Sequence, residues 1–309
     1  MNKLIYTLFI ICFTLFSTSG QIVINEYSAA NYNTSTDNYG EFEDWVELYN
    51  PTAAAIDING WALTDKPSNP TKWLFPSSFI IPANGVALIY CSGRDELIGT
   101  NAHSNFKITQ TKGNEIFMLS NAAGVFQDSI HVLPNQNSHT RGRETDGSAV
   151  WSVFTTGTPN ATNFGAMQEY ATTPIFSQVG GYNSAAINIT LSSPDPNITI
   201  YYTTNGDEPN NTSTQYTTAI NIATTSVIKA IAYSSDPNIP SSFIDYHTFF
   251  INDTHTIPIL SISGNQVDNL LNGNGGLEPE GTIEWFDKNG ILLDKGTGEY
   301  NKHGNDSWA

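Results

Sequence analysis

Short runs of β-branched and aromatic residues alternate with turn-forming residues along most of the chain, and helical periodicity is almost absent. The clearest runs are residues 21–27, 44–49, 85–90, 115–119 and 125–132, separated by Asn, Gly, Pro, Ser and Asp. Strands at this spacing with turn signals between them are typical of sandwiches and barrels. The pattern therefore predicts an all-β fold.

One run shows the two faces of a strand. Val46 and Leu48 fall on one face, and Trp45, Glu47 and Tyr49 fall on the other. Alternation of this kind suits a sheet that packs one face on the core.

Asparagine–glycine pairs mark the expected turns, because both residues tolerate positive φ. Such pairs stand at 59–60 and 84–85, residues 121–124 connect two strand-like runs, and residues 287–290 have the composition of a hairpin turn.

Lapses in the hydrophobic pattern divide the chain. The pattern weakens between about residues 158 and 174, resumes until about 251, and restarts at 255. We therefore expect a signal peptide at 1–20, a sandwich at 21–165, a second sandwich at 173–251, and the truncated, incomplete start of a further domain at 255–309.

The first twenty residues have the order of a secretory signal. Lys3 supplies a positive charge, residues 4–16 are uncharged and mostly apolar, and residues 17–20 are small. The apolar run is shorter than the roughly 20 residues that span a bilayer. We expect cleavage near Gly20, a mature protein that is secreted, extracellular or at the cell surface, and no transmembrane segment in it.

Charge limits the partners. The chain has 12 Lys and Arg against 29 Asp and Glu, a formal net charge of −17. Nucleic-acid affinity comes largely from basic groups that neutralise phosphates, so no nucleic-acid partner is expected. The same surface can attract divalent cations.

The first region carries a series of ordered motifs. They are Ile-Asn-Glu at 24–26 and the segments 44–50, 58–65, 73–76, 81–85, 104–106, 113–115 and 155–160. In these motifs the region resembles the lamin tail domain of secreted bacterial proteins. The resemblance implies an immunoglobulin-like β-sandwich without catalytic residues. Trp61 and Trp73 can either stack on a sugar or, as is more usual in a sandwich, pack in its core or at its rim.

The second region contains Tyr-Tyr-Thr-Thr-x-Gly-x-Glu-Pro at 201–209, between the segments 173–177 and 225–232. Here it is similar to the small β-sandwich at the C-terminus of chitobiase and β-hexosaminidase enzymes. In those enzymes the module accompanies a catalytic domain that this sequence lacks. The resemblance implies an accessory role and no glycosidase activity.

The third segment resembles the opening of the spore-coat-protein-H (CotH) kinase-like family at residues 257–262, 283–287 and 303–309. Kinase members of that family use ATP and a divalent metal. Their nucleotide and metal residues would lie beyond Ala309, so none is assigned here.

Familiar catalytic motifs are missing from the sequence. It has no Gly-x-Ser-x-Gly elbow, no His-Glu-x-x-His helix and no phosphate-binding Gly-x-x-x-x-Gly-Lys loop. His131 and His139 lack the paired spacing of a zinc site. We therefore assign no catalytic and no cofactor-binding residues.

One acidic constellation remains. Asp37, Glu41, Glu43 and Asp44 lie in a polar loop that leads into a strand. Oxygen ligands so concentrated can hold calcium, the one possible cofactor. The alternative is a solvated acidic loop, since the alternating Asp/Asn spacing of the familiar calcium loop is missing.

Three functions remain open. The chain is a non-catalytic binding or scaffolding region, with adhesion or presentation modules of a larger secreted bacterial protein that bind an unknown extracellular protein or glycan. Alternatively it is the N-terminal part of a secreted CotH-type phosphotransferase, or a pair of carbohydrate-binding accessory modules. Domain families of this kind do not fix a ligand.

Overall fold

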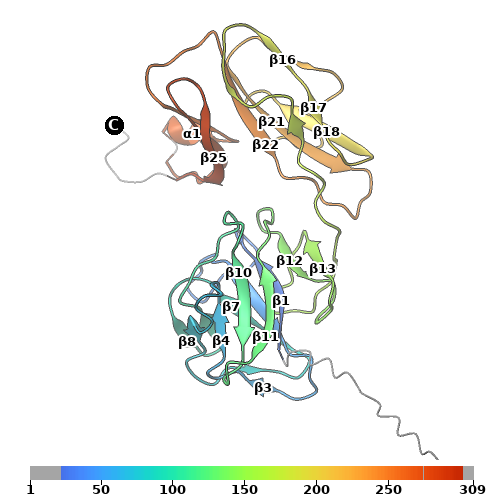
Figure 1. Ribbon diagram of the computed structural model, residues 1–309, viewed down its shortest axis with the longest axis vertical. Helices are drawn as coiled ribbons and strands as arrows, with labels where there is room; N and C mark the ends of the chain where they lie inside the picture. Colours follow the sequence, from blue (N-terminus) through green and yellow to red (C-terminus); the bar gives the residue numbers. More distant parts are fainter. Residues whose placement is uncertain (1–21, 274, 302–309) are drawn as a thin grey trace, which may run out of the picture. The chain divides into compact units, whose positions relative to one another are not determined.

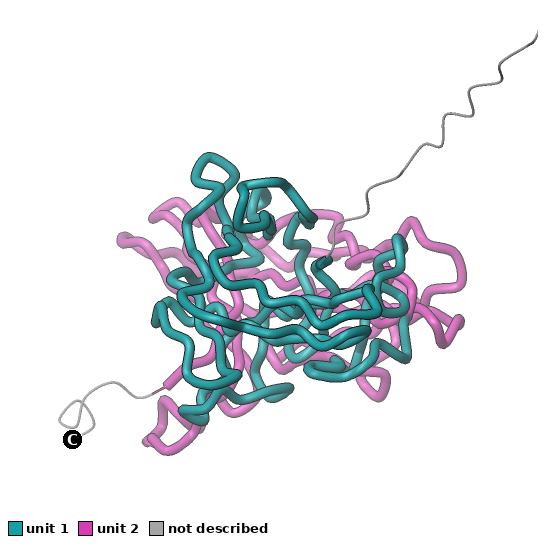
Figure 2. The backbone as a smooth tube through the Cα atoms, turned by 90° about the horizontal axis from the view of Figure 1, so that it is seen from below, with its two compact units in different colours: residues 1–166 teal, residues 167–309 magenta. Residues whose placement is uncertain are grey.

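The computed structural model describes residues 22–273 and 275–301. The chain divides into two compact units, residues 1–166 and 167–309 (Figure 2). The expected signal peptide and residues 303–309 lie outside the described part. The all-β prediction is confirmed, since the regular secondary structure of the described residues consists of strands apart from the short helix α1 (Val267–Leu271).

Unit 1 contains two main sheets (Figure 1). The larger has the order β13 (Trp151–Phe154), β12 (Thr140–Arg143), β1 (Val23–Ser28), β2 (Trp45–Tyr49), β7 (Val86–Tyr90), β9 (Asn101–His103) and β8 (Glu96–Ile98). The smaller has the order β11 (Phe126–His131), β10 (Ile116–Ser120), β4 (Ala62–Thr64) and β5 (Trp73–Leu74). Strands β3 (Ile56–Asp57) and β6 (Ile80–Ile81) form a separate pair.

The core of unit 1 contains the residues that the alternation assigned to it. Val46 and Leu48 are fully buried in this core together with side chains of the smaller sheet, such as Phe117. Trp61 and Trp73 also belong to it, with exposed fractions of 6% and 1%. The two tryptophans are therefore core residues, and neither offers a ring to a sugar.

A β-bulge shifts the alternation of inward-facing and outward-facing side chains along β1. The register with β2 shifts between Ile24 and Glu26. Ile24 and Tyr27 consequently both reach the core although they are three residues apart. The bulge also brings Glu26 directly opposite Glu47 on the other face of the sheet.

That other face is covered as well, which the alternation did not predict. Trp45 and Glu47 are fully buried, and Trp45 forms a second apolar cluster with Leu88 and Tyr90. The loop between β1 and β2 contributes to the cover, since the Tyr90 hydroxyl donates to the carbonyl of Thr36 at 2.7 Å. The segment after β13 also reaches this face.

Unit 2 begins with the second sandwich. Its main sheet has the order β15 (Gly181–Asn183), β22 (Asp245–Ile251), β21 (Ser226–Ser234), β18 (Ile198–Thr203) and β19 (Thr214–Gln215). The pairs β14 (Ile175–Phe176) with β17 (Leu191–Ser192) and β16 (Ile187–Ile189) with β20 (Ile220–Ile222) complete it. Ile189, Ile222 and Phe249 lie at the centre of its core.

The last described strands are β23 (Ile259–Ser263), β24 (Glu280–Phe286) and β25 (Leu292–Glu299), which form a three-stranded antiparallel sheet. The turn predicted at residues 287–290 joins β24 to β25, with the N–H of Gly290 donating to the carbonyl of Asp287 at 3.0 Å. The sheet packs against the second sandwich, where the rings of Phe250 and Phe286 meet edge to face at 5.2 Å.

No helix in the described ranges has the length and apolar character that crossing a membrane requires.

Candidate functional site

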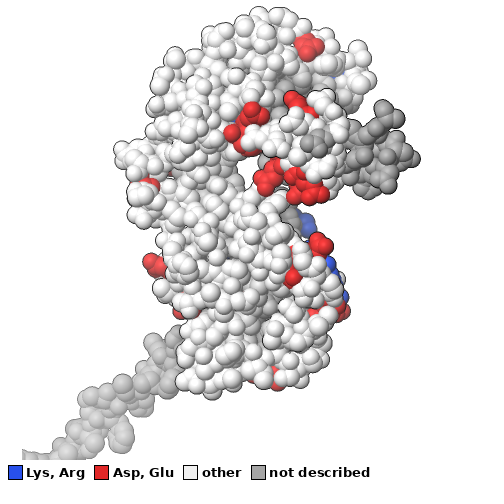
Figure 3. Space-filling model, turned by 180° about the vertical axis from the view of Figure 1, so that it is seen from behind, with Lys and Arg blue, Asp and Glu red and all other residues white. Residues whose placement is uncertain are grey.

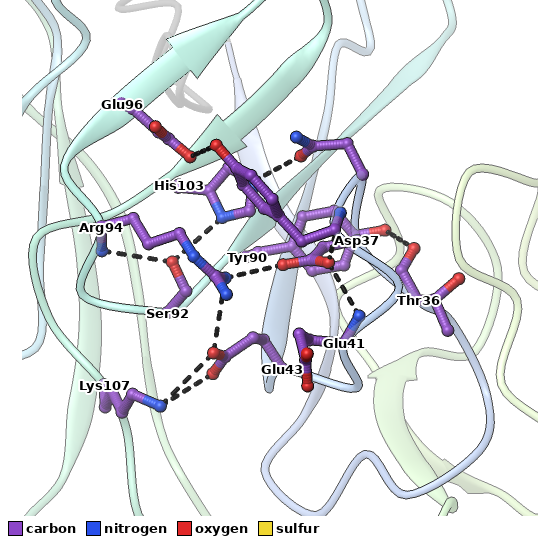
Figure 4. Close-up of polar contacts among 12 residues, drawn as sticks. Thr36, Asp37, Glu41, Glu43, Tyr90, Ser92, Arg94, Glu96, His103 and Lys107 are labelled. Carbon is purple, nitrogen blue, oxygen red and sulfur yellow. Dashed lines mark hydrogen bonds and ion pairs between the residues drawn. The ribbon is translucent and has the colours of Figure 1, made fainter.

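The four acidic residues singled out in the sequence lie in the segment that joins β1 to β2, and they have different environments. Figure 4 shows three of them, Asp37, Glu41 and Glu43. The carboxylate of Asp37 is fully buried. Glu41 is exposed, while Glu43 and Asp44 are partly buried.

Asp37 holds the loop in its shape. One carboxylate oxygen, Oδ1, accepts the backbone N–H groups of Tyr39 and Glu41 at 2.8 and 2.9 Å. The other, Oδ2, accepts from Arg94 Nη1 at 2.7 Å. Both oxygens of this buried carboxylate are therefore occupied by donors of the protein itself.

Two basic side chains pair with two of the four acids, Asp37 and Glu43. Arg94 Nη1 also lies 3.5 Å from Glu43 Oε1, and Lys107 Nζ lies 3.0 Å from Glu43 Oε2.

The Asp44 carboxylate accepts the backbone N–H of Asn31 at 3.1 Å. Burial raises the pKa of Asp44 to about 6, with the Glu43 charge contributing in the same direction.

These contacts favour an ion-paired loop over a calcium site. Residues 22–273 and 275–301 contain no group of three or more His, Cys, Asp or Glu side chains arranged to hold a metal ion. A bound calcium ion would also have to compete with Arg94 and Lys107 for the same carboxylates. The calcium site stays a prediction that a binding measurement has to decide.

His103, on β9 of the large sheet, contacts the loop at Asn38. Its Nε2 lies 2.8 Å from Asn38 Oδ1, and its Nδ1 lies 3.0 Å from Ser92 Oγ. An amide oxygen only accepts, so Nε2 carries the proton and Nδ1 accepts from the serine hydroxyl. Burial lowers the pKa of His103, against the opposing charge of Asp37. Ser92 is itself buried, so this serine–histidine contact is suited to anchoring the loop.

The loop presents aromatic rings to solvent. Tyr39 and Phe42 are 50% and 47% exposed. The Arg94 guanidinium lies over the Tyr39 ring at 4.5 Å, and the Tyr39 hydroxyl donates to Glu96 at 2.8 Å. We call Tyr39, Phe42 and Arg94 together the Tyr39 surface. Exposed aromatic rings, one of them beside a held guanidinium, can bind a sugar face or a peptide.

Sequence reasoning missed a second polar site, on the covered face of the large sheet. Glu26 and Glu47 lie opposite each other there, both fully buried. Asn25 Nδ2 lies within hydrogen-bonding distance of both Glu47 Oε1 and Asp146 Oδ1, at 3.1 and 3.0 Å. Burial raises the pKa of Glu47 to about 8, and the nearby Glu26 charge adds to the shift.

This carboxylate pair holds the segment that leaves the sandwich. The backbone N–H of Thr158 donates to Glu26 at 3.0 Å, and that of Asn160 donates to Glu47 at 2.7 Å. The motifs at 24–26, 44–50 and 155–160 include the two glutamates and the two residues whose backbone N–H groups donate to them. Nothing in the motifs shows that Glu26 and Glu47 lie opposite each other, because that contact depends on the bulge in β1. The pair therefore has a structural role in closing the unit.

The fold defines two consecutive immunoglobulin-like β-sandwich modules, a class consistent with binding or accessory modules. The family model described as "Lamin Tail Domain" matches residues 16–133, and that described as "Chitobiase/beta-hexosaminidase C-terminal domain" matches residues 178–244. The resemblances of the first two regions are thus supported, although neither model covers half of the chain. No curated protein matches it. Neither family model reaches residues 255–309, whose CotH resemblance stays a prediction.

Proposed function

We propose that this chain is the extracellular binding and presentation region of a larger secreted bacterial protein, with its two sandwiches acting as adhesion or presentation modules. The observation that carries the proposal is the tandem of two modules matched to separate families, the first of which exposes the Tyr39 surface. Binding modules of this kind hold a ligand through loops on a rigid scaffold.

The extracellular placement rests on the signal-like residues 1–20 and on the charge. Acidic groups are more prominent than basic ones on the face of each unit seen in Figure 3. A net charge of −17 keeps a protein dispersed and disfavours polyanionic partners. N-terminal sequencing of the exported protein tests this part of the proposal, with Gln21 expected as the first residue and Met1 contradicting it.

Binding is tested on an array of purified extracellular glycans and matrix proteins. The wild-type chain is compared with the variant Y39A/F42A and with the control F126A, because Phe126 is an exposed ring of the same unit outside the loop. We expect Y39A/F42A to lose array binding at least about tenfold, the effect of removing one or two aromatic contacts at a binding centre. Binding that is equal in all three proteins, or no binding at all, contradicts the proposal.

Carbohydrate binding by unit 2 is the second candidate, because residues 178–244 match a family described by the name of glycan-hydrolysing enzymes. The same array distinguishes it, since N-acetylglucosamine oligomers would then bind the chain and its 167–301 fragment equally.

A secreted CotH-type phosphotransferase is the remaining alternative. Transfer of label from ATP by the 21–309 chain with Mg²⁺ or Mn²⁺ would support it, whereas we expect none.

A further inference from the structure

His247 lies between two carboxylates that belong to different sheets of unit 2. It is on β22 of the second sandwich and is 5% exposed. Its Nε2 lies 3.6 Å from Oδ2 of Asp245 on the same strand. Its Nδ1 lies 3.7 Å from Oε1 of Glu284 on β24, in the three-stranded sheet.

The two ring nitrogens cannot both serve a carboxylate unless the ring is charged. Neutral imidazole has one N–H and one lone pair, whereas imidazolium has two N–H groups. In the neutral state one of the two carboxylates therefore faces a lone pair. At 3.6 and 3.7 Å the nitrogen and oxygen atoms are too far apart for hydrogen bonds, so the attraction across both contacts depends on the charge of the ring.

Glu284 depends on this charge more than Asp245 does. Asp245 also pairs with Lys295. Glu284 is 2% exposed, and its Oε2 accepts from the Thr248 hydroxyl. Its Oε1 has no hydrogen-bond partner in the described ranges, and the same is true of His247 Nδ1. A buried carboxylate that has no positive partner is strongly destabilising.

The charges that face His247 come from three strands. Asp245 on β22 and Glu284 on β24 are negative, and Lys295 on β25 is positive. The rings of Phe176 and Phe249 meet the imidazole edge to face at 4.9 and 6.2 Å and carry no charge. Burial of the ring disfavours its charge, but the two carboxylates outweigh burial and Lys295, so the pKa of His247 is raised.

We propose that His247 is a pH-sensitive clasp that holds the three-stranded sheet β23–β25 on the second sandwich. The clasp is closed while the ring is imidazolium and is weakened when the ring loses its proton. Thr248, beside the clasp, donates to Glu284 and also lines an open groove of about 460 Å³ whose other wall is β23. Release of Glu284 would therefore alter this groove.

The sign of the effect follows from the raised pKa. The folded state holds the proton more tightly than the unfolded state, whose value is the ordinary one near 6.5. The stabilisation is fully present below that ordinary value and is lost as the pH rises through the folded-state pKa. Acidic conditions thus close the clasp, and alkaline conditions loosen it.

The first test follows His247 in the full chain by NMR while amide hydrogen exchange of β24 is measured over the same pH range and corrected for the intrinsic exchange rate. We expect the imidazole to titrate above its ordinary value. Protection of β24 should fall across that transition, by roughly tenfold for each unit of pKa difference. A titration at or below the ordinary value, or protection that rises with pH, overturns the proposal without any substitution.

Variants then separate the clasp from packing. H247Q removes the titrating ring and should abolish the pH dependence of β24 protection. E284Q removes the charge that the ring has to balance and should flatten the same profile. The matched control is H255Q, because His255 lies 3.6 Å from Asp253 in the same unit but is 41% exposed. A pH profile that H247Q leaves unchanged, or that H255Q flattens equally, contradicts the proposal.

Discussion

Arg94 Nη1 lies 2.7 Å from Oδ2 of Asp37, a residue 57 positions earlier in the chain. The Asp37 carboxylate is fully buried, whereas the Arg94 side chain is 31% exposed. A charge buried to this degree needs a partner, and Arg94 supplies it from the segment that follows β7. The shape of the Tyr39 surface therefore depends on a contact between two distant parts of unit 1.

Replacement of Arg94 by Gln should destabilise unit 1 by about 1–3 kcal/mol, the range for leaving a buried acceptor unsatisfied, because Asp37 Oδ2 loses its partner while Oδ1 keeps two backbone donors. Urea unfolding of the chain measures this. The matched control is K107Q, because Lys107 is 67% exposed and pairs with Glu43. Exposed pairs contribute at most about 1 kcal/mol. Equal losses in the two variants would contradict the central role of Arg94.

Calcium binding should be limited by the same two cations. Because Arg94 and Lys107 already neutralise Asp37 and Glu43, we expect the double variant R94Q/K107Q to bind calcium more tightly than the wild-type chain. Isothermal titration calorimetry measures both. The opposite result would be tighter calcium binding by the wild-type chain than by R94Q/K107Q. If D37N then abolishes the binding, the loop is a calcium site, as one interpretation of its four acids predicts.

Much of the fold follows from local pattern. The alternation that places Val46 and Leu48 inward survives in the structure because one face of a strand has to meet the core. The turn at residues 287–290 is also encoded locally, by residues that tolerate its geometry.

The candidate site depends on contacts that no local pattern contains. Asp37 and Arg94 meet only because the β1–β2 loop lies over the end of β7. Glu26 and Glu47 face each other only because a bulge inserts one residue into β1. His247 and Glu284 belong to regions that the hydrophobic pattern separated. Each of these contacts is set by tertiary packing.

Glu47 should make the largest contribution to the pH dependence of unit 1, ahead of Asp44, whose pKa is raised only to about 6. The pKa of Glu47 is about 8 in the folded state, against an ordinary value of 4.5. The stabilisation from its protonated form is full below about pH 4.5 and is lost as the pH rises through about 8. We expect the wild-type unit to lose about 2–4 kcal/mol between pH 5 and 8, and E47Q to lose less. Thermal unfolding at several pH values measures this.

The control for this experiment is E144Q, because Glu144 is an exposed acid in the same unit. Its profile should follow the wild type. An E47Q variant whose stability falls with pH as steeply as that of the wild-type chain would show that Glu47 is not the group responsible.

The two units should unfold separately, and the three-stranded sheet should matter for the second. We expect fragments 22–166 and 167–301 each to melt cooperatively with β-type circular dichroism, as domains with their own cores do. Fragment 173–251 should also fold, but it lacks Phe286, which covers Phe250. Exposing a buried phenylalanine costs about 1.5–3 kcal/mol. A domain of this size loses roughly 4–8 °C for each kcal/mol. Fragment 173–251 should therefore melt about 10 °C below fragment 167–301. An unfolded 173–251 fragment would place the boundary after the three-stranded sheet, and equal melting temperatures would show that the sheet adds no stability.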